Sequence, residues 1–148
     1  MAQRPTLVYD ADCAFCTRSA QVARRWVDRQ GRYDVRPWQE LDLAALGLTA
    51  EQCDEAAQFV RVDGAIRSGH EAIAAALMHG APGWRPLGHV LLAPGVRALA
   101  ARTYAWVAEH RHQLPGGTAQ CARPEPGDDR TAGDAPRAPG LRQRPGPI

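Results

Sequence analysis

The stretch that decides the fold runs from Tyr9 to Cys16 and reads YDADCAFC. The residues just before it, TLV, predict a short buried strand that ends at Asp10. From Cys13 onward the apolar residues follow a helical period, so Cys13 and Cys16 lie where this strand gives way to a helix. The first amides of a helix lack partners within it, so this positive end favours a thiolate, the form of cysteine that attacks disulfides. The sequence thus predicts a reactive dithiol at the start of the first helix.

The segments that follow predict a small α/β domain. The first helix is closed by Gly31, and a second strand at Tyr33–Val35 stops at Pro37. A strand, a helix and a strand within about thirty residues form a βαβ unit with parallel strands. Further on, Thr49-Ala50-Glu51-Gln52 has the pattern of a capping box that opens a short helix. Asp63-Gly64 separates two strand-like runs and predicts a hairpin with a type I′ turn.

Two later helices complete the predicted order. Ser68-Gly69-His70-Glu71 has a pattern that caps a helix ending at Gly80. The segment through Trp84 and Pro86 is rich in Pro and Gly and is expected to be a loop, after which Pro94 begins the last helix at its first position. The side chains expected to face the core are Phe15, Val22, Trp26 and Val27 in the first helix, Ile73, Ala76 and Leu77 in the middle one, and Val96, Leu99, Ala100, Thr103 and Val107 in the last.

Composition excludes several classes of function. A chain of 148 residues that is 45% hydrophobic suffices for one domain with one core. The net charge of +2 is evenly spread, so no nucleic-acid partner is expected. The longest apolar stretch, His89–Ala108, is interrupted by Arg97 and Arg102, so no integral membrane segment is expected either. All 18 basic residues are arginine, which leaves no lysine as a Schiff-base nucleophile or tunable base.

The cysteines point to a reducing compartment. No apolar signal region precedes the first strand, so the expected location is the cytoplasm. Four cysteines in a cytoplasmic chain are expected to be reduced at rest. Cys13 and Cys16 are therefore interpreted as reactive or metal-binding and not as a structural disulfide.

The order strand, Cys-x-x-Cys, helix, strand, helix, hairpin, helix is that of an α/β, thioredoxin-like fold. Residues 10–16 fit the Asp-x-x-Cys-x-x-Cys signature of the DCC family of thiol-disulfide oxidoreductases, which the sequence resembles. The Asp63-Gly64 hairpin, the helix start at Ser68–Ala72 and the segment from Tyr104 to Gly117 are similar to the family too. The resemblance spans residues 5–121 and implies a thioredoxin-like DCC-type domain over 1–121. Residues 122–148 lack aromatics, are dense in Pro, Gly and Arg, and are expected to be a disordered tail.

Two departures from related sequences bear on geometry. Many members of the family carry Gly where this chain has Ala11, and a positive φ there would strain Ala. Thioredoxins have a proline before the hairpin that helps to shape the substrate groove. This chain has Ala57 and Gln58 before Phe59.

The positions of the site residues predict their chemical roles. Cys13, nearest the helix end, is expected to be the more exposed thiol and the nucleophile, and Cys16 is expected to resolve the mixed disulfide. Asp12 either caps the helix or, as an anion beside Cys13, opposes the thiolate. Asp10 either shuttles the proton of Cys16 or is a turn-forming Asp that bonds the backbone two residues on. Arg18 is interpreted as a solvated helix arginine, with thiolate stabilisation as the alternative.

Three further residues are secondary candidates. Cys53 is expected to be a small apolar residue that pairs with Leu48 in a hydrophobic staple. Cys121 is either a third redox thiol or a bystander at the edge of the domain. His70 is a candidate for facing the cysteine site.

The leading hypothesis is an intracellular thiol-disulfide oxidoreductase with a reducing dithiol. Its partners would be protein or small-molecule thiols and disulfides, and it would need neither a metal nor an organic cofactor. One alternative is a zinc-binding interaction module, in which Cys53 or Cys121 with a histidine completes a site begun by Cys13 and Cys16. The other is a non-catalytic adaptor on a thioredoxin-like scaffold, supported by the surplus aromatics Tyr104 and Trp106.

Overall fold

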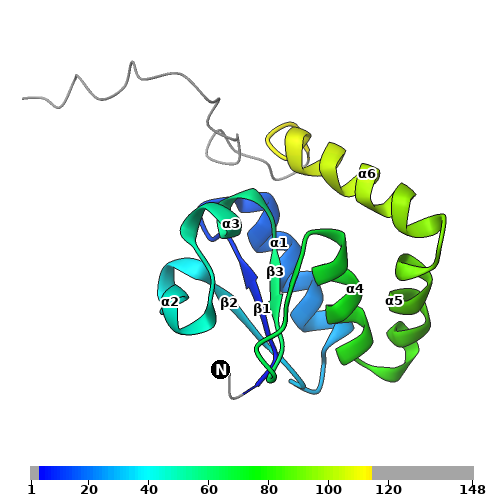
Figure 1. Cartoon of the computed structure of the whole chain (residues 1–148), viewed down its shortest axis with the longest axis horizontal. Coiled ribbons are helices and arrows are strands. Elements are labelled where there is room, and N and C mark those ends of the chain that lie inside the picture. Colours follow the sequence, from blue (N-terminus) through cyan, green and yellow to red (C-terminus); the bar gives the residue numbers. More distant parts are fainter. Residues whose placement is uncertain (1–3, 115–148) are drawn as a thin grey trace, which may run out of the picture.

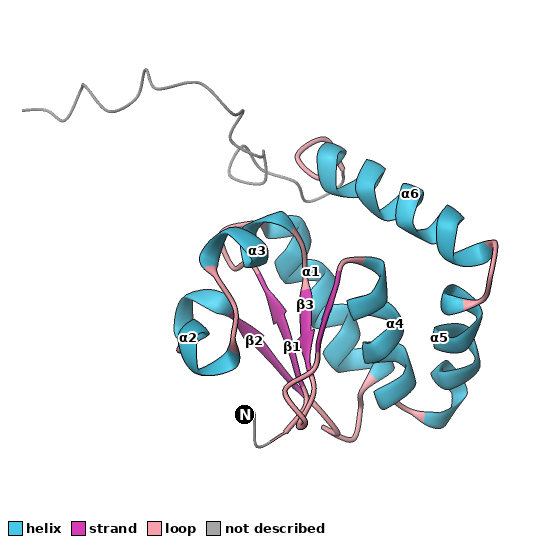
Figure 2. Cartoon of the chain, in the orientation of Figure 1, coloured by secondary structure: helices cyan, strands magenta, loops and turns pink. Residues whose placement is uncertain are grey.

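The computed structural model describes residues 4–114 (Figure 1). The expected domain end at residue 121, the expected tail 122–148 and Cys121 lie outside the described residues. Within residues 4–114, helices pack on both faces of one small sheet, and the last helices continue from one side of it (Figure 2).

The sheet has four strands in the order β2-β1-β3-β4. β1 spans Thr6–Tyr9 and pairs in parallel with β2, Asp34–Pro37. β3 spans Gln58–Val60 and lies antiparallel to β1 and to β4, Ile66–Ser68. The predicted βαβ unit and hairpin are therefore confirmed. The mixed α/β architecture is compatible with a thioredoxin-like fold.

Two helices cover one face of the sheet. They are α1, Ala14–Val22, which continues as a π-helix over Ala23–Val27, and α4, His70–His79. Leu7 on β1 lies opposite Val35 on β2 and Phe59 on β3, so this face presents a continuous apolar row to the helices. The buried cluster on this face consists of Leu7, Ala20, Tyr33, Val35, Phe59, Ala72, Ala75 and Ala76.

Shorter elements cover the opposite face: a 3-10 helix at Trp38–Glu40, α2 at Leu43–Leu46, and α3 at Ala50–Glu55. The predicted capping box is present at the start of α3, where Thr49 and Gln52 satisfy each other's backbone amides. The buried cluster on this side consists of Val8, Leu48, Cys53 and Val60. The burial of Leu48 and Cys53 in one cluster agrees with the predicted staple.

The prediction of a loop between the last two helices was wrong. A 3-10 helix at Pro82–Trp84 leads directly into α5, Arg85–Leu92. Pro86 lies in the first turn of α5, where a missing amide is harmless because that amide has no helical partner. Gly88, buried in α5, faces α4 at a distance that leaves no room for a side chain. Pro and Gly suggested a loop, but here Pro86 lies at the start of α5 and Gly88 allows α5 to pack closely on α4.

The last helix, α6, spans Val96–His110 and presents only part of the expected face to the domain. Val107 lines a cavity on that side as predicted, but Leu99 is 66% exposed and Val96 is also exposed, and Tyr104 and Arg111 line the cavity in their place. Figure 1 shows α6 running across the end of the molecule where β1 ends and α1 begins.

Three smaller expectations were also wrong. Val22 and Trp26 on the first helix are exposed, and so is Ile73 on α4, although Ala76 and Leu77 are buried as predicted. The hairpin turn is not type I′, because no described residue other than glycine has positive φ. Arg61 and Ala65 instead flank a three-residue loop in which only Gly64, with φ +81°, adopts the left-handed conformation.

Candidate active site

The backbone at the end of β1 makes Cys13 the residue that caps α1. Cys13 has extended φ and ψ of −93° and 110°, and its Sγ accepts a hydrogen bond from the Cys16 amide at 3.3 Å. The Thr17 amide donates to the Cys13 carbonyl at 2.9 Å and starts the helical ladder. The prediction that Asp12 caps the helix was therefore wrong. The sulfur itself occupies the position where the amides at the start of the helix stabilise negative charge.

The relative exposure of the two cysteines is the reverse of the prediction. Cys13 is 0% exposed because its side chain turns back onto the first turn of α1. Cys16 is half-buried and lines a cavity of about 590 Å³. The two cysteines approach each other to 3.0 Å, and no disulfide is present among the cysteines of residues 4–114. The pair is thus close enough to react together, with Cys16 on the accessible side.

The turn between β1 and α1 is held by a glutamine that the sequence analysis missed. Gln39 donates to Asp10 Oδ1 at 2.7 Å and to Asp12 Oδ2 at 3.2 Å, and it accepts from the Ala11 amide at 3.2 Å. It follows β2, and because β1 and β2 are parallel, both strands end at the same edge of the sheet. That topology was the only signal that could have brought Gln39 to the site.

Asp10 plays the turn-forming role that was one of its two predicted roles. Its Oδ1 accepts from the Asp12 amide at 3.0 Å, two residues on, and the residue is buried. Asp10 also lines the same cavity as Cys16, so its structural role in the turn does not remove it from the site. Ala11 does not have positive φ, since no described non-glycine residue does, and the turn therefore holds Ala without strain.

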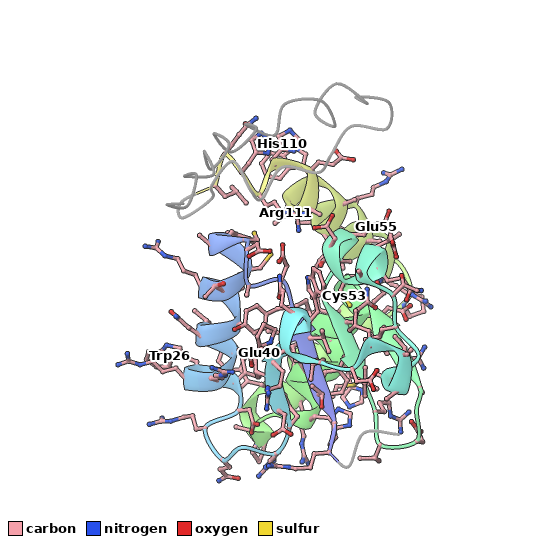
Figure 3. All side chains as sticks on the ribbon, turned by 90° about the vertical axis from the view of Figure 1, so that its left-hand side faces the viewer. Trp26, Glu40, Cys53, Glu55, His110 and Arg111 are labelled. Atoms are coloured by element: carbon pink, nitrogen blue, oxygen red, sulfur yellow. The ribbon has the colours of Figure 1, made fainter. Side chains whose placement is uncertain are left out.

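The arginine that contacts the cysteine pair is Arg111, not Arg18. Arg111 follows α6 and is only 6% exposed. Its Nη1 lies 3.9 Å from Cys16 Sγ, and its Nη2 donates to the Asp54 carbonyl at 3.1 Å. Burial alone lowers the pKa of Arg111, but the charges of Cys16, Cys13 and Asp54 outweigh it and leave that pKa raised. Figure 3 shows Arg111 and Glu55 at the same end of the molecule.

Tyr104 joins α6 to the segment before the hairpin. Its hydroxyl accepts from the Ala57 amide at 3.0 Å, and its ring packs against Gly69. The Ala57 carbonyl in turn accepts from the Gly69 amide at 3.0 Å. Burial raises the pKa of Tyr104, so its hydroxyl stays neutral. Both backbone groups of Ala57, at the place where thioredoxins have their proline segment, are therefore used within the chain.

The cavity explains the side chains that were expected to be buried and are not. Val22 on α1 and Ile73 on α4 border it, and Tyr104, Val107 and Arg111 close it from the α6 side. Its lining is mostly apolar, with charged groups gathered around Cys16. Such a hollow suits a ligand that has an apolar body and a reactive group at the sulfur.

A comparison with known protein families identifies the family of this chain. The profile of the DCC1-like thiol-disulfide oxidoreductase family matches residues 7–117. The chain belongs to this family. The match covers both cysteines, Gln39, Tyr104 and Arg111, and the family's name implies thiol-disulfide oxidoreductase activity. Comparisons with curated proteins and with solved structures gave no match.

The secondary candidates of this DCC1-like chain have surroundings that differ from those of the reactive pair. Cys53 lines the same cavity as Cys16, but it is buried in the cluster beneath α3, and burial raises its pKa to about 11, which keeps it a thiol at neutral pH. His70 is not among the residues that line the cavity, and its Nε2 is buried with no hydrogen-bond partner in residues 4–114. Arg18 lines the cavity but is exposed, in agreement with its interpretation as a solvated arginine.

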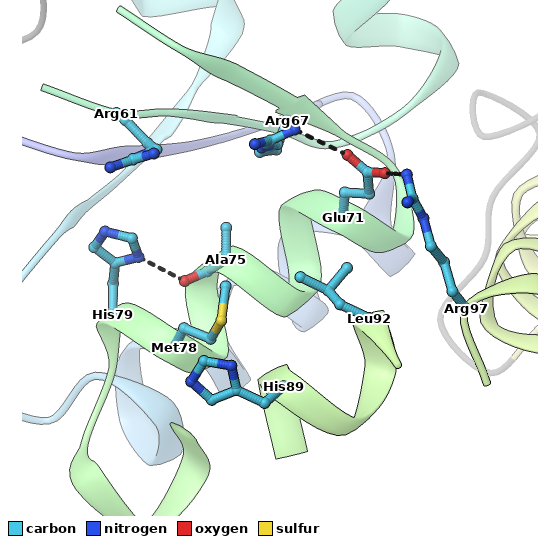
Figure 4. Close-up of a pocket in the computed structure, with 9 residues that line it drawn as sticks. All are labelled: Arg61, Arg67, Glu71, Ala75, Met78, His79, His89, Leu92 and Arg97. Carbon is cyan, nitrogen blue, oxygen red and sulfur yellow. Dashed lines mark hydrogen bonds and ion pairs between the residues drawn. The ribbon is translucent and has the colours of Figure 1, made fainter. Parts of the chain in front are cut away.

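A second cavity, of about 440 Å³, lies between the hairpin, α4 and α5 (Figure 4). Glu71 pairs with Arg67 at 3.5 Å and also with Arg97 from α6, while His79 Nδ1 contacts the Ala75 carbonyl at 2.8 Å. No cysteine lines this cavity. The charge of Glu71 is paired within the chain, and the ion pair between Glu71 and Arg97 links α4 to α6.

The structure bears on the hypothesis of a zinc-binding module. Among residues 4–114, there is no group of three or more His, Cys, Asp or Glu side chains that could hold a metal ion. Cys121, a ligand that the zinc hypothesis invoked, lies outside the described residues. None of the described helices has the length and apolar character needed to cross a bilayer.

Proposed function

We propose that this DCC1-like chain exchanges electrons with thiols and disulfides by forming and reducing a disulfide between Cys13 and Cys16. The observation that carries the proposal is the cap of α1, where Cys13 Sγ accepts from the Cys16 amide and the two cysteines approach to 3.0 Å. A sulfur in this position has its thiolate stabilised by the helix end and a second sulfur within reach.

The exchange proceeds in two displacements. One thiolate attacks a substrate disulfide, so a mixed disulfide forms as the substrate's sulfur–sulfur bond breaks and one substrate thiolate leaves. The second cysteine, deprotonated, attacks the sulfur of the first and expels the remaining substrate thiolate. Two electrons pass to the substrate, and the protein keeps a Cys13–Cys16 disulfide. An external thiol returns it to the dithiol form.

Asp10 and Asp12 are proposed to take part in the site. In this proposal Asp10, which is buried and lines the same cavity as Cys16, accepts the proton that Cys16 gives up before it reacts. Asp12 is an exposed anion beside Cys13, and it tempers the positive helix end. Gln39 fixes both carboxylates relative to the cysteines.

The proposed direction is reducing and the proposed location is the cytoplasm. Two carboxylates close to the pair and the uncharged dipeptide Ala14-Phe15 give little of the thiolate stabilisation that makes a strong oxidant. The proposed substrates are protein or small-molecule disulfides, supported by the family's thiol-disulfide chemistry and by the cavity that Cys16 lines.

The test is equilibration in glutathione redox buffers, followed by acid quenching, alkylation and mass spectrometry. We expect a reversible Cys13–Cys16 bridge with a potential of about −230 to −270 mV, in the range of cellular reductants. Cys13→Ser and Cys16→Ser should abolish the bridge, and the control Cys53→Ala should keep it. Failure of the pair to bridge in any buffer would overturn the proposal. Stoichiometric zinc or unchanged biological function in the double serine variant would favour an interaction module instead.

A further inference from the structure

We propose that Arg111 stabilises the Cys16 thiolate and that Cys16, not Cys13, attacks the substrate disulfide. The inference rests on the proposed function and assigns the order of events within the same pair. It reverses the expectation from the sequence, in which the cysteine at the helix end attacks first.

Accessibility is the first argument. A substrate sulfur must approach in line with the attacking thiolate, and Cys13 is 0% exposed. Cys16 is half-buried and lines the cavity of about 590 Å³, whereas Cys13 does not line it. Cys13 is instead held inside, with its sulfur bonded to the Cys16 amide at 3.3 Å. From that position Cys13 can reach Cys16 but not an outside disulfide, which is the placement of a resolving thiol.

The placement of Arg111 is the second argument. Its Nη1 lies 3.9 Å from Cys16 Sγ, while its Nη2 is anchored to the Asp54 carbonyl at the end of α3. A guanidinium stays charged at all working pH values, and its planar fork can hold both contacts at once. A cation within about 4–6 Å shifts the titration midpoint of an acid toward lower pH by roughly 1–3 units.

The other charged groups of this cavity do not supply a second buried cation. Asp10, which follows β1, is buried in the cavity lining and opposes a second negative charge, whereas Glu55 from α3 lines the cavity but is exposed, so solvent screens its charge. Tyr104 from α6 is neutral at working pH, and Arg18 from α1 is exposed, so solvent screens its charge. Arg111 is the arginine of this cavity that is both buried and in contact with the sulfur.

The chemistry then has a fixed order. The Cys16 thiolate attacks the substrate disulfide, and a Cys16–substrate bond forms as the first substrate thiolate leaves. Cys13, once deprotonated, attacks Cys16 Sγ, and the second substrate thiolate leaves as the Cys13–Cys16 bond forms. The proton of Cys16 goes to Asp10 or to solvent before the attack, and two external thiol groups, which become a disulfide, supply the two electrons that reset the pair.

The test isolates Cys16 in a full-length Cys13→Ser, Cys53→Ala, Cys121→Ser background and measures its iodoacetamide alkylation rate against pH. Arg111→Gln should raise the midpoint by about one unit, because the fixed cation is lost. At a pH well below both midpoints this means tenfold less thiolate, partly offset by its higher nucleophilicity, and alkylation about threefold to fourfold slower. Arg111→Lys should keep most of the shift. The matched control Arg18→Gln, which removes a screened arginine from the same cavity, should move the midpoint by less than about 0.2 unit.

Two results would overturn the role of Arg111. One is an unchanged midpoint in a folded Arg111→Gln variant. The other is a midpoint at or above about 8.5, the value of an unperturbed cysteine, in the background that keeps Arg111. The second result needs no Arg111 variant and decides the question even if Arg111→Gln fails to fold.

The order of attack is tested by trapping with glutathione disulfide. The Cys13→Ser variant should accumulate a mixed disulfide at Cys16, and Cys16→Ser should react more than about tenfold slower at Cys13, because that sulfur is enclosed. Faster trapping at Cys13 would overturn the order. These outcomes are separate from the bridging assay, since a pair that bridges while Cys13 attacks first would leave the proposed function intact.

Discussion

The cysteines of this chain differ in chemistry because their surroundings differ. Cys13 has an amide donor and no exposure, Cys16 has an arginine and a cavity, and Cys53 is buried in an apolar cluster. Cysteine reactivity follows the thiolate fraction and access. Cys13, Cys16 and Cys53 are therefore expected to differ in reactivity although they lie in one small domain.

Cys53 supplies a prediction about stability and pH. Burial raises its pKa from 9.0 to about 11, so the thiol is favoured in the folded state and the unfolded chain loses the proton first. Its contribution is fully present below pH 9 and is lost as pH rises toward 11. We expect the free energy of unfolding, measured in urea, to fall more steeply over this range for the native chain than for Cys53→Ala. Parallel pH profiles of the two proteins would contradict the assignment.

At the scale of elements, the attachment of α6 decides whether the site is complete. α6 contributes Tyr104 and positions Arg111, which directly follows it, yet no residue within α6 itself is buried. It is held by polar contacts: the Tyr104 hydroxyl on Ala57, Arg97 on Glu71, and the Arg111 contact with Asp54 that follows it. The catalytic arginine thus depends on a helix with few apolar anchors.

Tyr104→Phe tests this attachment. Removing the hydroxyl leaves the Ala57 amide without its acceptor, and we expect the free energy of unfolding to fall by about 1–3 kcal/mol. Tyr33→Phe is the matched control, because the Tyr33 hydroxyl is buried with no hydrogen-bond partner in residues 4–114. Its loss should be neutral or stabilising. Equal effects of the two changes in urea unfolding would show that the Tyr104 bond does not hold α6.

The packing of α5 on α4 gives a second prediction at this scale. A Cβ at Gly88 would lie 2.6 Å from Met78 Cγ and 2.8 Å from the Ala74 carbonyl, and a backbone oxygen cannot move aside cheaply. Gly88→Ala should therefore destabilise by about 1–2 kcal/mol, because overpacking exceeds the gain in helix propensity. Gly83→Ala, with nothing within 4 Å of its Cβ, should stay within about 0.5 kcal/mol. A stabilised Gly88→Ala in thermal or urea unfolding would show that the two helices separate easily.

At the scale of the whole molecule, the working unit is the part of the chain that the family profile covers. That profile ends at residue 117, and the residues of the site lie between Asp10 and Arg111. The composition of residues 122–148, which lie outside the described residues, led to the expectation that they form no part of the domain. We therefore propose that 1–121 folds and reacts alone.

Deletion of residues 122–148 tests this division. We expect the melting temperature to change by less than about 2 °C and the Cys13–Cys16 bridge to form as in the full chain. Circular dichroism and the glutathione-buffer assay measure the two quantities. A truncated chain that melts much earlier, or a pair whose potential shifts, would show that the tail belongs to the domain.

Local signals in the sequence determined much of the architecture. The Thr6–Tyr9 strand, the βαβ unit, the capping box at Thr49 and Gln52, and the hairpin at Gly64 are as predicted, apart from the turn type. Periodicity, caps and turn residues act over a few neighbours, so one chain segment contains the whole signal. The same applies to the Cys-x-x-Cys motif, whose spacing alone placed both sulfurs on the first turn.

Tertiary structure alone decided how that motif is used. Gln39 reaches the turn before Cys13, and Arg111 reaches Cys16, from positions far along the chain, because parallel strands end at one edge and α6 folds back across it. Exposure likewise depends on which elements cover a residue, and this is why Cys13 is enclosed while Cys16 faces the cavity. Spacing in a sequence fixes which atoms can meet within a turn, but solvent access and distant charges arise only when the helices pack.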